Sequence, residues 1–171
     1  QQVEDFVRGC TLFATGGGGL PKNGIRSLMD EIEAGRNVGW VDVSEIKDDM
    51  MSCCPFLMGS IAPHDEATIK EMASYDMTPE TSVNLEGDRM AKAVLALQEY
   101  TGKKFDVIVP IELAGANAPA AMAAASKLGI VTVDGDYTGR AIPEIVQITY
   151  NYNGHCLTPI ASVDEWGNEC I

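Results

Sequence analysis

The segment VDGDYTGRAIPE (133–144) gathers the side chains best suited to chemistry in this chain. Asp134 and Asp136 are two positions apart, so their side chains share one face if the backbone there is extended. Arg140 and Glu144 add a cation and a further carboxylate. Such a cluster can bind a divalent metal ion, Zn²⁺ or Mg²⁺, through Asp134 and Asp136. It can also place a general acid or base, and on that interpretation Asp136, Arg140 and Glu144 are catalytic.

Two other interpretations of this segment stay open. A solvated turn with an ordinary Asp–Arg ion pair has the same composition. Arg140 could instead bind a substrate carboxylate through two parallel hydrogen bonds.

A second candidate lies in PIELAGANAPA (110–120). Glu112 follows an apolar run that predicts a buried strand, and in open α/β sheets ligands bind beyond the carboxyl ends of the strands. We therefore predict that Glu112 is catalytic. Asn117 is a candidate for binding substrate, although it could simply cap the helix that follows.

Four consecutive glycines form the third candidate, in the stretch Thr15 to Gly19. Exposed backbone N–H groups followed by a helix N-terminus make a good site for an anion. We predict that this stretch binds substrate through five residues: Thr15, Gly16, Gly17, Gly18 and Gly19. The alternative is a tight turn that needs glycine only for its geometry.

A dinucleotide site is a further interpretation of the glycine run. The fingerprint GxGxxG is matched by Gly16 and Gly18, but Pro21 stands at the third position. Asp42 comes at the end of the next predicted strand, where an acid could bind a ribose. The match is incomplete.

The histidines and cysteines offer weaker candidates. The chain has only two histidines, His64 and His155, so a histidine-rich zinc site within it is excluded. Its five cysteines have no zinc-ribbon spacing, and we expect reduced thiols in a cytoplasmic protein. The apolar surroundings of Cys53 and Cys54 predict packing rather than reactivity.

Composition narrows the classes of partner. The formal net charge is −13, from 25 acidic and 12 basic residues, which argues against nucleic acid or an anionic membrane as a partner. No apolar run approaches the length of a membrane span.

Helices and strands are predicted to alternate along the sequence. These elements must position the candidate site residues. An apolar face at helical spacing predicts a helix over 20–35, after a short element at 7–15. Further helices are expected over 65–75, 84–102 and 117–129. Strands are expected over 37–43, 53–62, 105–113 and 130–136. The segments 145–154 and 156–164 are predicted to be antiparallel strands around a turn at Asn153–Gly154.

This order predicts an α/β fold, a three-layer sandwich with a mainly parallel central sheet and a β-rich carboxy-terminal end. No linker or repeat divides the chain, so residues 1–171 are expected to form a single domain.

Four segments together resemble the S-methyl-thiohydantoin desulfurase-like family, formerly a domain of unknown function associated with hydantoinase and oxoprolinase proteins. They are TGGGGLPKNG, ELAGAN (112–117), VDGDYTGRAIPE and PIASVDEWGN, in order over nearly the whole chain. The family pattern E-x-G-G-x-N has Ala114 here in place of its first glycine.

The resemblance implies the amino-terminal α/β domain of a longer two-domain protein, whose smaller second domain is absent here or is a separate subunit. It implies hydrolysis of a small cyclic amide or thiohydantoin with loss of a thiol, with a divalent metal as a possible aid. We expect a small-molecule substrate and a homo-oligomer. Two alternatives are a nucleotide- or anion-binding module without chemistry and a partner subunit of a hydantoinase/oxoprolinase-type complex.

Overall fold

A short parallel β-sheet lies at the centre of the fold. The computed structural model describes residues 1–59, 63–83 and 86–171. Strands β1 (Ser52–Cys53), β2 (Val107–Ile108) and β3 (Val131–Thr132) pair in parallel in the order β1-β2-β3. The predicted α/β class with a parallel centre is confirmed, although each strand is shorter than its apolar run.

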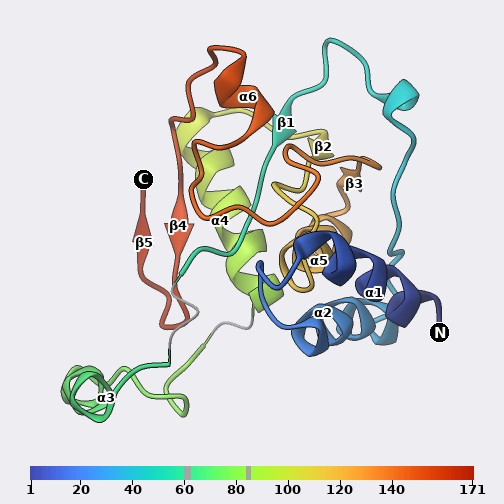
Figure 1. Ribbon diagram of the computed structural model, residues 1–171. Coiled ribbons are helices and arrows are strands. Elements are labelled where there is room, and N and C mark those ends of the chain that lie inside the picture. Colours follow the sequence, from blue (N-terminus) through green and yellow to red (C-terminus); the bar gives the residue numbers. More distant parts are fainter. Residues whose placement is uncertain (60–62, 84–85) are drawn as a thin grey trace.

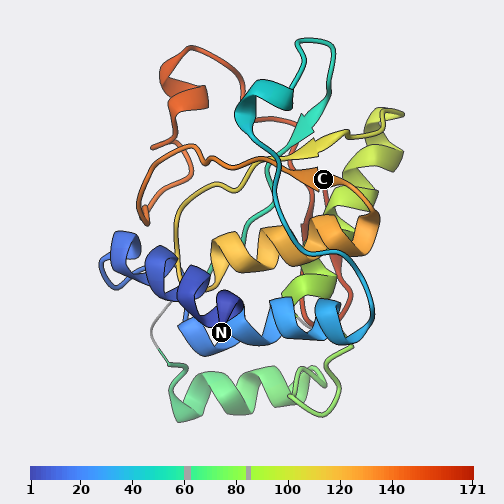
Figure 2. The same ribbon diagram turned by 90° about the vertical axis from the view of Figure 1, so that its right-hand side faces the viewer.

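Helices and long irregular segments make up most of the rest of the described chain (Figure 1). The bounds of the helices are α1 (Gln2–Ala14), α2 (Pro21–Glu33), α3 (Glu66–Ser74), α4 (Glu86–Thr101) and α5 (Asn117–Leu128). The helices predicted over 20–35, 65–75, 84–102 and 117–129 are confirmed, with residues 84–85 outside the described part. The short element expected at 7–15 is the end of helix α1. Helix α3 carries no buried residue and lies apart from the other helices in both views (Figures 1 and 2).

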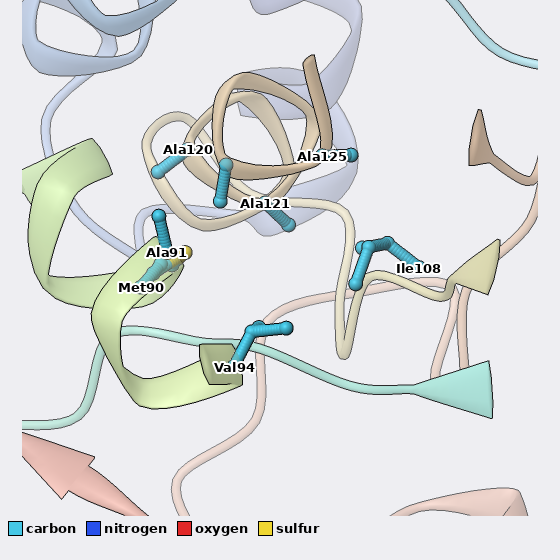
Figure 3. Close-up of a cluster of buried hydrophobic side chains, with 8 residues drawn as sticks. Met90, Ala91, Val94, Ile108, Ala120, Ala121 and Ala125 are labelled. Atoms are coloured by element: carbon cyan, nitrogen blue, oxygen red, sulfur yellow. The ribbon is translucent and has the colours of Figure 1, made fainter. Parts of the chain in front are cut away.

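Helix α5 is the centre of the core. Every residue from Asn117 to Ala125 is buried, and most of these residues are alanine. Small side chains let neighbouring elements approach closely on several sides. One side of α5 packs with helix α4 and strand β2 (Figure 3). That cluster consists of Met90, Ala91, Val94, Ile108, Ala120, Ala121, Ala124 and Ala125.

The other side of α5 faces helices α1 and α2. Val7 and Leu28 pack there against Met122 and Ala123. Together the two clusters fix both the start of α5 and the end of β2, the two elements that carry the candidate residues of 110–120.

An ion network around the buried Glu31 joins α2, α5 and α4 beside this core. Glu31 is 3% exposed and is bonded to Arg36, while its other oxygen lies 3.6 Å from Lys127 Nζ. Lys127 is bonded in turn to Asp88. The buried carboxylate therefore has two cationic partners.

The strand predicted over 37–43 is wrong for most of its length. Only Val41 makes an isolated parallel bridge, with Val133. Asp42 accepts the Ser44 N–H at 2.8 Å and begins the 3₁₀ helix η1 (Val43–Glu45), which ends any extended run. The strand expected over 53–62 is reduced to Ser52–Cys53, and residues 60–62 lie outside the described part.

The β-rich carboxy-terminal end is not confirmed, and the hairpin predicted at Asn153–Gly154 is wrong. Within 145–154 the chain forms the short helix α6 (Thr149–Tyr152). Strand β4 (Ser162–Val163) pairs instead with β5 (Glu169–Cys170). The turn between β4 and β5 is stabilised by Asp164, which accepts the N–H groups of Trp166 and Asn168 at 2.9 and 2.8 Å. This side-chain bonding places the hairpin further along the chain than the Asn-Gly pair indicated.

The layers around the sheet are unequal. Helices α5, α2 and α1 lie on one side of it, and the short helix α6 lies on the other (Figure 2). A full three-layer sandwich is not confirmed. None of the helices in the described part is long and apolar enough to cross a membrane.

Candidate functional site

The glycine loop, residues 16–19, connects α1 to α2 and packs directly on the start of α5. The carbonyl oxygen of Gly18 accepts the N–H groups of Ala116 and Asn117, at 3.1 and 3.2 Å. Gly18 has a φ of +71°, in the left-handed region. A Cβ built on it would lie 2.0 Å from the Ala114 Cβ and 2.8 Å from Glu112 Oε1. Glycine is needed at 18 both for its conformation and because the loop touches the segment of Glu112.

Three backbone N–H groups of this loop have no partner among the described residues. Within the described part of the chain, the N–H groups of Gly16, Gly18 and Gly19 make no hydrogen bond. Thr15, which ends α1 in a left-handed conformation, is exposed beside them. The loop can therefore offer backbone donors to a ligand, as its composition indicated.

Glu112 lies just beyond the end of β2 and is 3% exposed. Its Oε1 accepts from Asn117 Nδ2 at 2.6 Å, and its Oε2 accepts from the Ile142 N–H at 2.8 Å. A buried carboxylate must have such partners, since burial without them is very costly. Glu112 thus connects the start of α5 with the segment 133–144.

Asn117 is the second buried polar residue of the site, at 7% exposure. Besides Glu112 it contacts the chain that leaves β1, accepting the Leu57 N–H at 2.5 Å. Its Nδ2 also donates to the Leu57 carbonyl oxygen at 3.2 Å. The expectation of a helix N-cap through its side chain does not hold, because Ala116 is the N-cap residue and no side-chain cap bond forms.

The segment 136–142 forms the third part of the site. Asp136 is half-buried, and its Oδ2 accepts the Gly139 N–H at 2.8 Å. Thr138 Oγ1 lies 2.6 Å from the Arg140 carbonyl oxygen and 3.2 Å from that of Ile111, next to Glu112. A Cβ built on Gly17 would lie 2.7 Å from the Ala141 Cβ, so this segment also touches the glycine loop.

Two thiols, Cys54 and Cys10, have raised pKa values. Burial raises the pKa of the Cys54 thiol, and the neighbouring Cys53 raises it further. The charges of Asp136 and Glu112 act in the same direction on this pKa. Burial, and to a lesser degree Asp136, raises the pKa of Cys10 to about 11. These thiols stay protonated at neutral pH, as expected of Cys54 from its apolar surroundings.

The geometry thus brings three segments that are distant in sequence onto one end of the sheet: 16–19, 112–117 and 136–142. The four segments that carried the family resemblance include all of them. A family model for the S-Me-THD-like N-terminal domain matches residues 1–171. The chain belongs to this family.

Other comparisons support the fold of this S-Me-THD-like domain. The crystal structure of a protein from Chromobacterium violaceum is similar, with a TM-score of 0.67 and 24% identity over 98% of this chain. The chain spans 42% of the length of that protein. No curated protein matches the chain.

Three of the site residues predicted for this S-Me-THD-like domain are exposed, unlike the buried Glu112 and Asn117. Asp134 is exposed, and its N–H donates to the Val41 carbonyl oxygen at 2.8 Å. Arg140 is exposed and its Nε donates to the carbonyl oxygen of Ala141, the next residue, at 3.3 Å. Glu144 is exposed as well. Their part in the site remains a prediction.

The predicted metal ion would have two carboxylate ligands, Asp134 and Asp136, and it stays a prediction. Across residues 1–59, 63–83 and 86–171, no group of three or more His, Cys, Asp or Glu side chains is arranged to hold one. Of the two predicted ligands, Asp136 already accepts a backbone N–H, and Asp134 belongs to no such group among these residues. No step below is routed through a metal.

Asp42, His155 and His64 were considered for other kinds of site, and their surroundings are as follows. Asp42 Oδ1 accepts both the hydroxyl and the N–H of Ser44, and these hydrogen bonds lower the pKa of the Asp42 carboxyl. His155 stacks on Tyr150, with ring centroids 4.6 Å apart. His64 is exposed.

Sequence reasoning missed Ile142 and Thr138 as parts of the site. Ile142 acts through its backbone N–H, which no side-chain pattern reveals.

Proposed function

We propose that this domain is the carboxylate-bearing part of a hydrolase for a small cyclic amide of the thiohydantoin type. The family description supports the substrate class. The rest of the proposal rests on one observation: the buried Glu112 carboxylate joins the glycine loop to the segment of Asp136, and three N–H groups of that loop have no partner among the described residues.

The reaction this arrangement suits is the hydrolysis of an S-methyl thiohydantoin. Water adds to the ring carbon that carries sulfur, the carbon–sulfur bond breaks, and the products are the hydantoin and methanethiol. The water gives up both protons: one passes through a base to the departing sulfur, and the other ends on the ring nitrogen as the carbonyl group of hydantoin forms.

Asp136 is the carboxylate we propose as the base. It is half-buried and so can meet both water and a bound ring, whereas Glu112 is almost fully buried. Glu112 supplies a fixed negative charge and holds Ile142, and with it the 136–142 segment, in place. The proposed roles are general base for Asp136 and orientation for Glu112.

The glycine loop is the part we propose for stabilising negative charge. As water adds, charge develops on the ring, and N–H groups of Gly16, Gly18 and Gly19 that are already in position stabilise it without reorganisation. Thr15, Arg140 and Glu144 complete the proposed site by orienting the substrate.

A second domain or subunit also belongs to this proposal. The chain spans 42% of the similar Chromobacterium protein, which supports a larger functional unit. A homo-oligomer and a full three-layer sandwich are proposed with it.

The test is release of thiol from an S-methyl thiohydantoin by the full-length protein. Asp136→Asn should lower turnover by at least about 100-fold and leave the melting temperature unchanged. Asp48→Asn, at an exposed position remote in sequence from all three segments, is the matched control for loss of one charge. Equal turnover in the two variants would remove Asp136 from the mechanism.

A second candidate function is anion or nucleotide binding without chemistry. The same unpaired N–H groups of the glycine loop favour it, although Asp42 is already bonded to Ser44. A panel of phosphates and dinucleotides separates the two functions, since a ligand that binds only the folded state raises the melting temperature. No shift with any member of the panel argues against this function.

A further inference from the structure

Asn117 has no hydrogen-bonding capacity left for a substrate through its amide nitrogen. A neutral side-chain amide has two N–H donors. One is directed at Glu112 Oε1, 2.6 Å away, and the other at the Leu57 carbonyl oxygen, 3.2 Å away. The Asn117 oxygen accepts the Leu57 N–H. At 7% exposure, the side chain is also largely closed to solvent.

The contacts of Asn117 connect the chain segments that leave two neighbouring strands. The Leu57 side of the amide belongs to the chain that leaves β1, and the Glu112 side belongs to the chain that leaves β2. Glu112 extends this connection to Ile142, because its second oxygen accepts the Ile142 N–H. The three bonds form a continuous path from Leu57 to Ile142.

From this path we infer that Asn117 is a positioning residue, which orients Glu112 and through it the 136–142 segment, and does not bind substrate. This revises the expectation that Asn117 belongs to the substrate-binding set. The kinetic part of the inference rests on the proposed function, but its structural part does not.

The substitution Asn117→Asp separates the two contacts of this residue. The carboxylate that it introduces can still accept the Leu57 N–H, but it has no donor for Glu112 Oε1 and places a second negative charge beside it. Asn117→Ala removes both contacts, and Glu112→Gln tests the last bond of the path alone. The control is Asn153→Asp, at an exposed amide whose Nδ2 donates to the Thr149 carbonyl oxygen at 2.9 Å.

The activity-independent readout is amide hydrogen exchange at Leu57 and Ile142 in the full-length protein. In Asn117→Asp, we expect exchange at Ile142 to rise by about five- to tenfold, as for loss of one ordinary hydrogen bond, while Leu57 stays protected. In Asn117→Ala, both amides should exchange faster. Unchanged exchange at Ile142 in both variants would overturn the inference, because the path predicts that Ile142 responds through Glu112.

The kinetic readout separates positioning from substrate binding. If wild-type protein releases thiol, Asn117→Asp should lower kcat by about 100-fold, as a small misplacement does, with KM within about twofold of wild type. A raised KM with kcat unchanged would assign Asn117 to substrate binding and overturn the inference. If wild-type protein releases no thiol, the proposed function fails and the exchange rates alone decide the role of Asn117.

Discussion

Gly18 and Glu112 are in contact across the site, since a Cβ built on Gly18 would lie 2.8 Å from Glu112 Oε1. The same Cβ would lie 2.0 Å from the Ala114 Cβ. The loop can approach the end of β2 this closely only with hydrogen in place of a side chain.

The first prediction compares Gly18→Ala with Gly16→Ala. Both glycines have a positive φ, but a Cβ on Gly16 would meet nothing within 4 Å. Gly16→Ala should cost about 1 kcal/mol of unfolding free energy from backbone strain. Gly18→Ala should cost about 1–3 kcal/mol more, from the clash. Urea denaturation measures the unfolding free energy of both variants. Equal losses would show that residue 18 is not in close contact with Ala114.

The second prediction concerns the charge on Glu112. In Glu112→Gln one oxygen becomes an NH₂ group, which must face either Asn117 Nδ2 or the Ile142 N–H, both donors. We expect the unfolding free energy to fall by about 1–3 kcal/mol. Glu144→Gln, at an exposed position, should leave stability within about 0.5 kcal/mol of wild type. Chemical denaturation of the two variants side by side measures the difference, and a fully stable Glu112→Gln would contradict the hydrogen-bonding scheme.

The third prediction concerns Thr132 on β3. Its hydroxyl is buried and, within the residues that the structure describes, has no hydrogen-bond partner. Thr132→Val keeps the shape and removes the unsatisfied oxygen, so stability should stay equal or rise by up to about 1 kcal/mol. Thr132→Ser keeps the oxygen and removes the methyl group, and should cost about 1 kcal/mol. Thermal melts rank the three proteins, and a destabilised valine variant would mean that the hydroxyl has a partner.

The fourth prediction concerns the ion network of Glu31. Lys127→Met leaves this buried carboxylate with Arg36 as its remaining cation, so we expect a loss of about 2 kcal/mol or more. Arg26→Met breaks an exposed pair with Asp30, 3.8 Å apart, and should change stability by less than about 1 kcal/mol. A double-mutant cycle between Glu31→Gln and Lys127→Met should show coupling of at least about 0.5 kcal/mol. Additive losses would indicate that the pair does not interact.

The fifth prediction concerns thiol reactivity. Hydrogen bonds from Thr158 lower the pKa of the exposed Cys156, whereas burial raises the pKa of Cys53 to about 11. Because the thiolate is the reactive form, alkylation near neutral pH should modify Cys156 well before Cys53. Labelling of Cys53 should accelerate as the pH rises towards 11, and Thr158→Val should slow labelling of Cys156. Mass spectrometry of timed samples gives the order, and Cys53 reacting first would contradict it.

The position of Glu112 beside the segment after β3 follows from a general rule. Parallel strands end at one edge, so Glu112 after β2 and the acids after β3 had to lie near each other, and the glycines indicated close backbone contact. The link through the Ile142 N–H was not predictable, because every residue except proline has that donor. The prediction of a hairpin at Asn153–Gly154 was wrong because an Asn-Gly pair also suits the end of a helical turn. The hairpin forms at Asp164 instead, where the side chain accepts two backbone N–H groups of the turn.

Helix α3 buries none of its side chains. Within the described residues, α3 is stabilised by its own backbone bonds, by the Asp65 carboxylate at its first turn and, beyond its end, by the hydrogen bond from the Trp166 indole to the Thr78 carbonyl oxygen. A protease added in trace amounts should cut within 66–74 before it cuts elsewhere in the described chain. The two pieces should then stay together, because the core around α5 contains no atom from that helix.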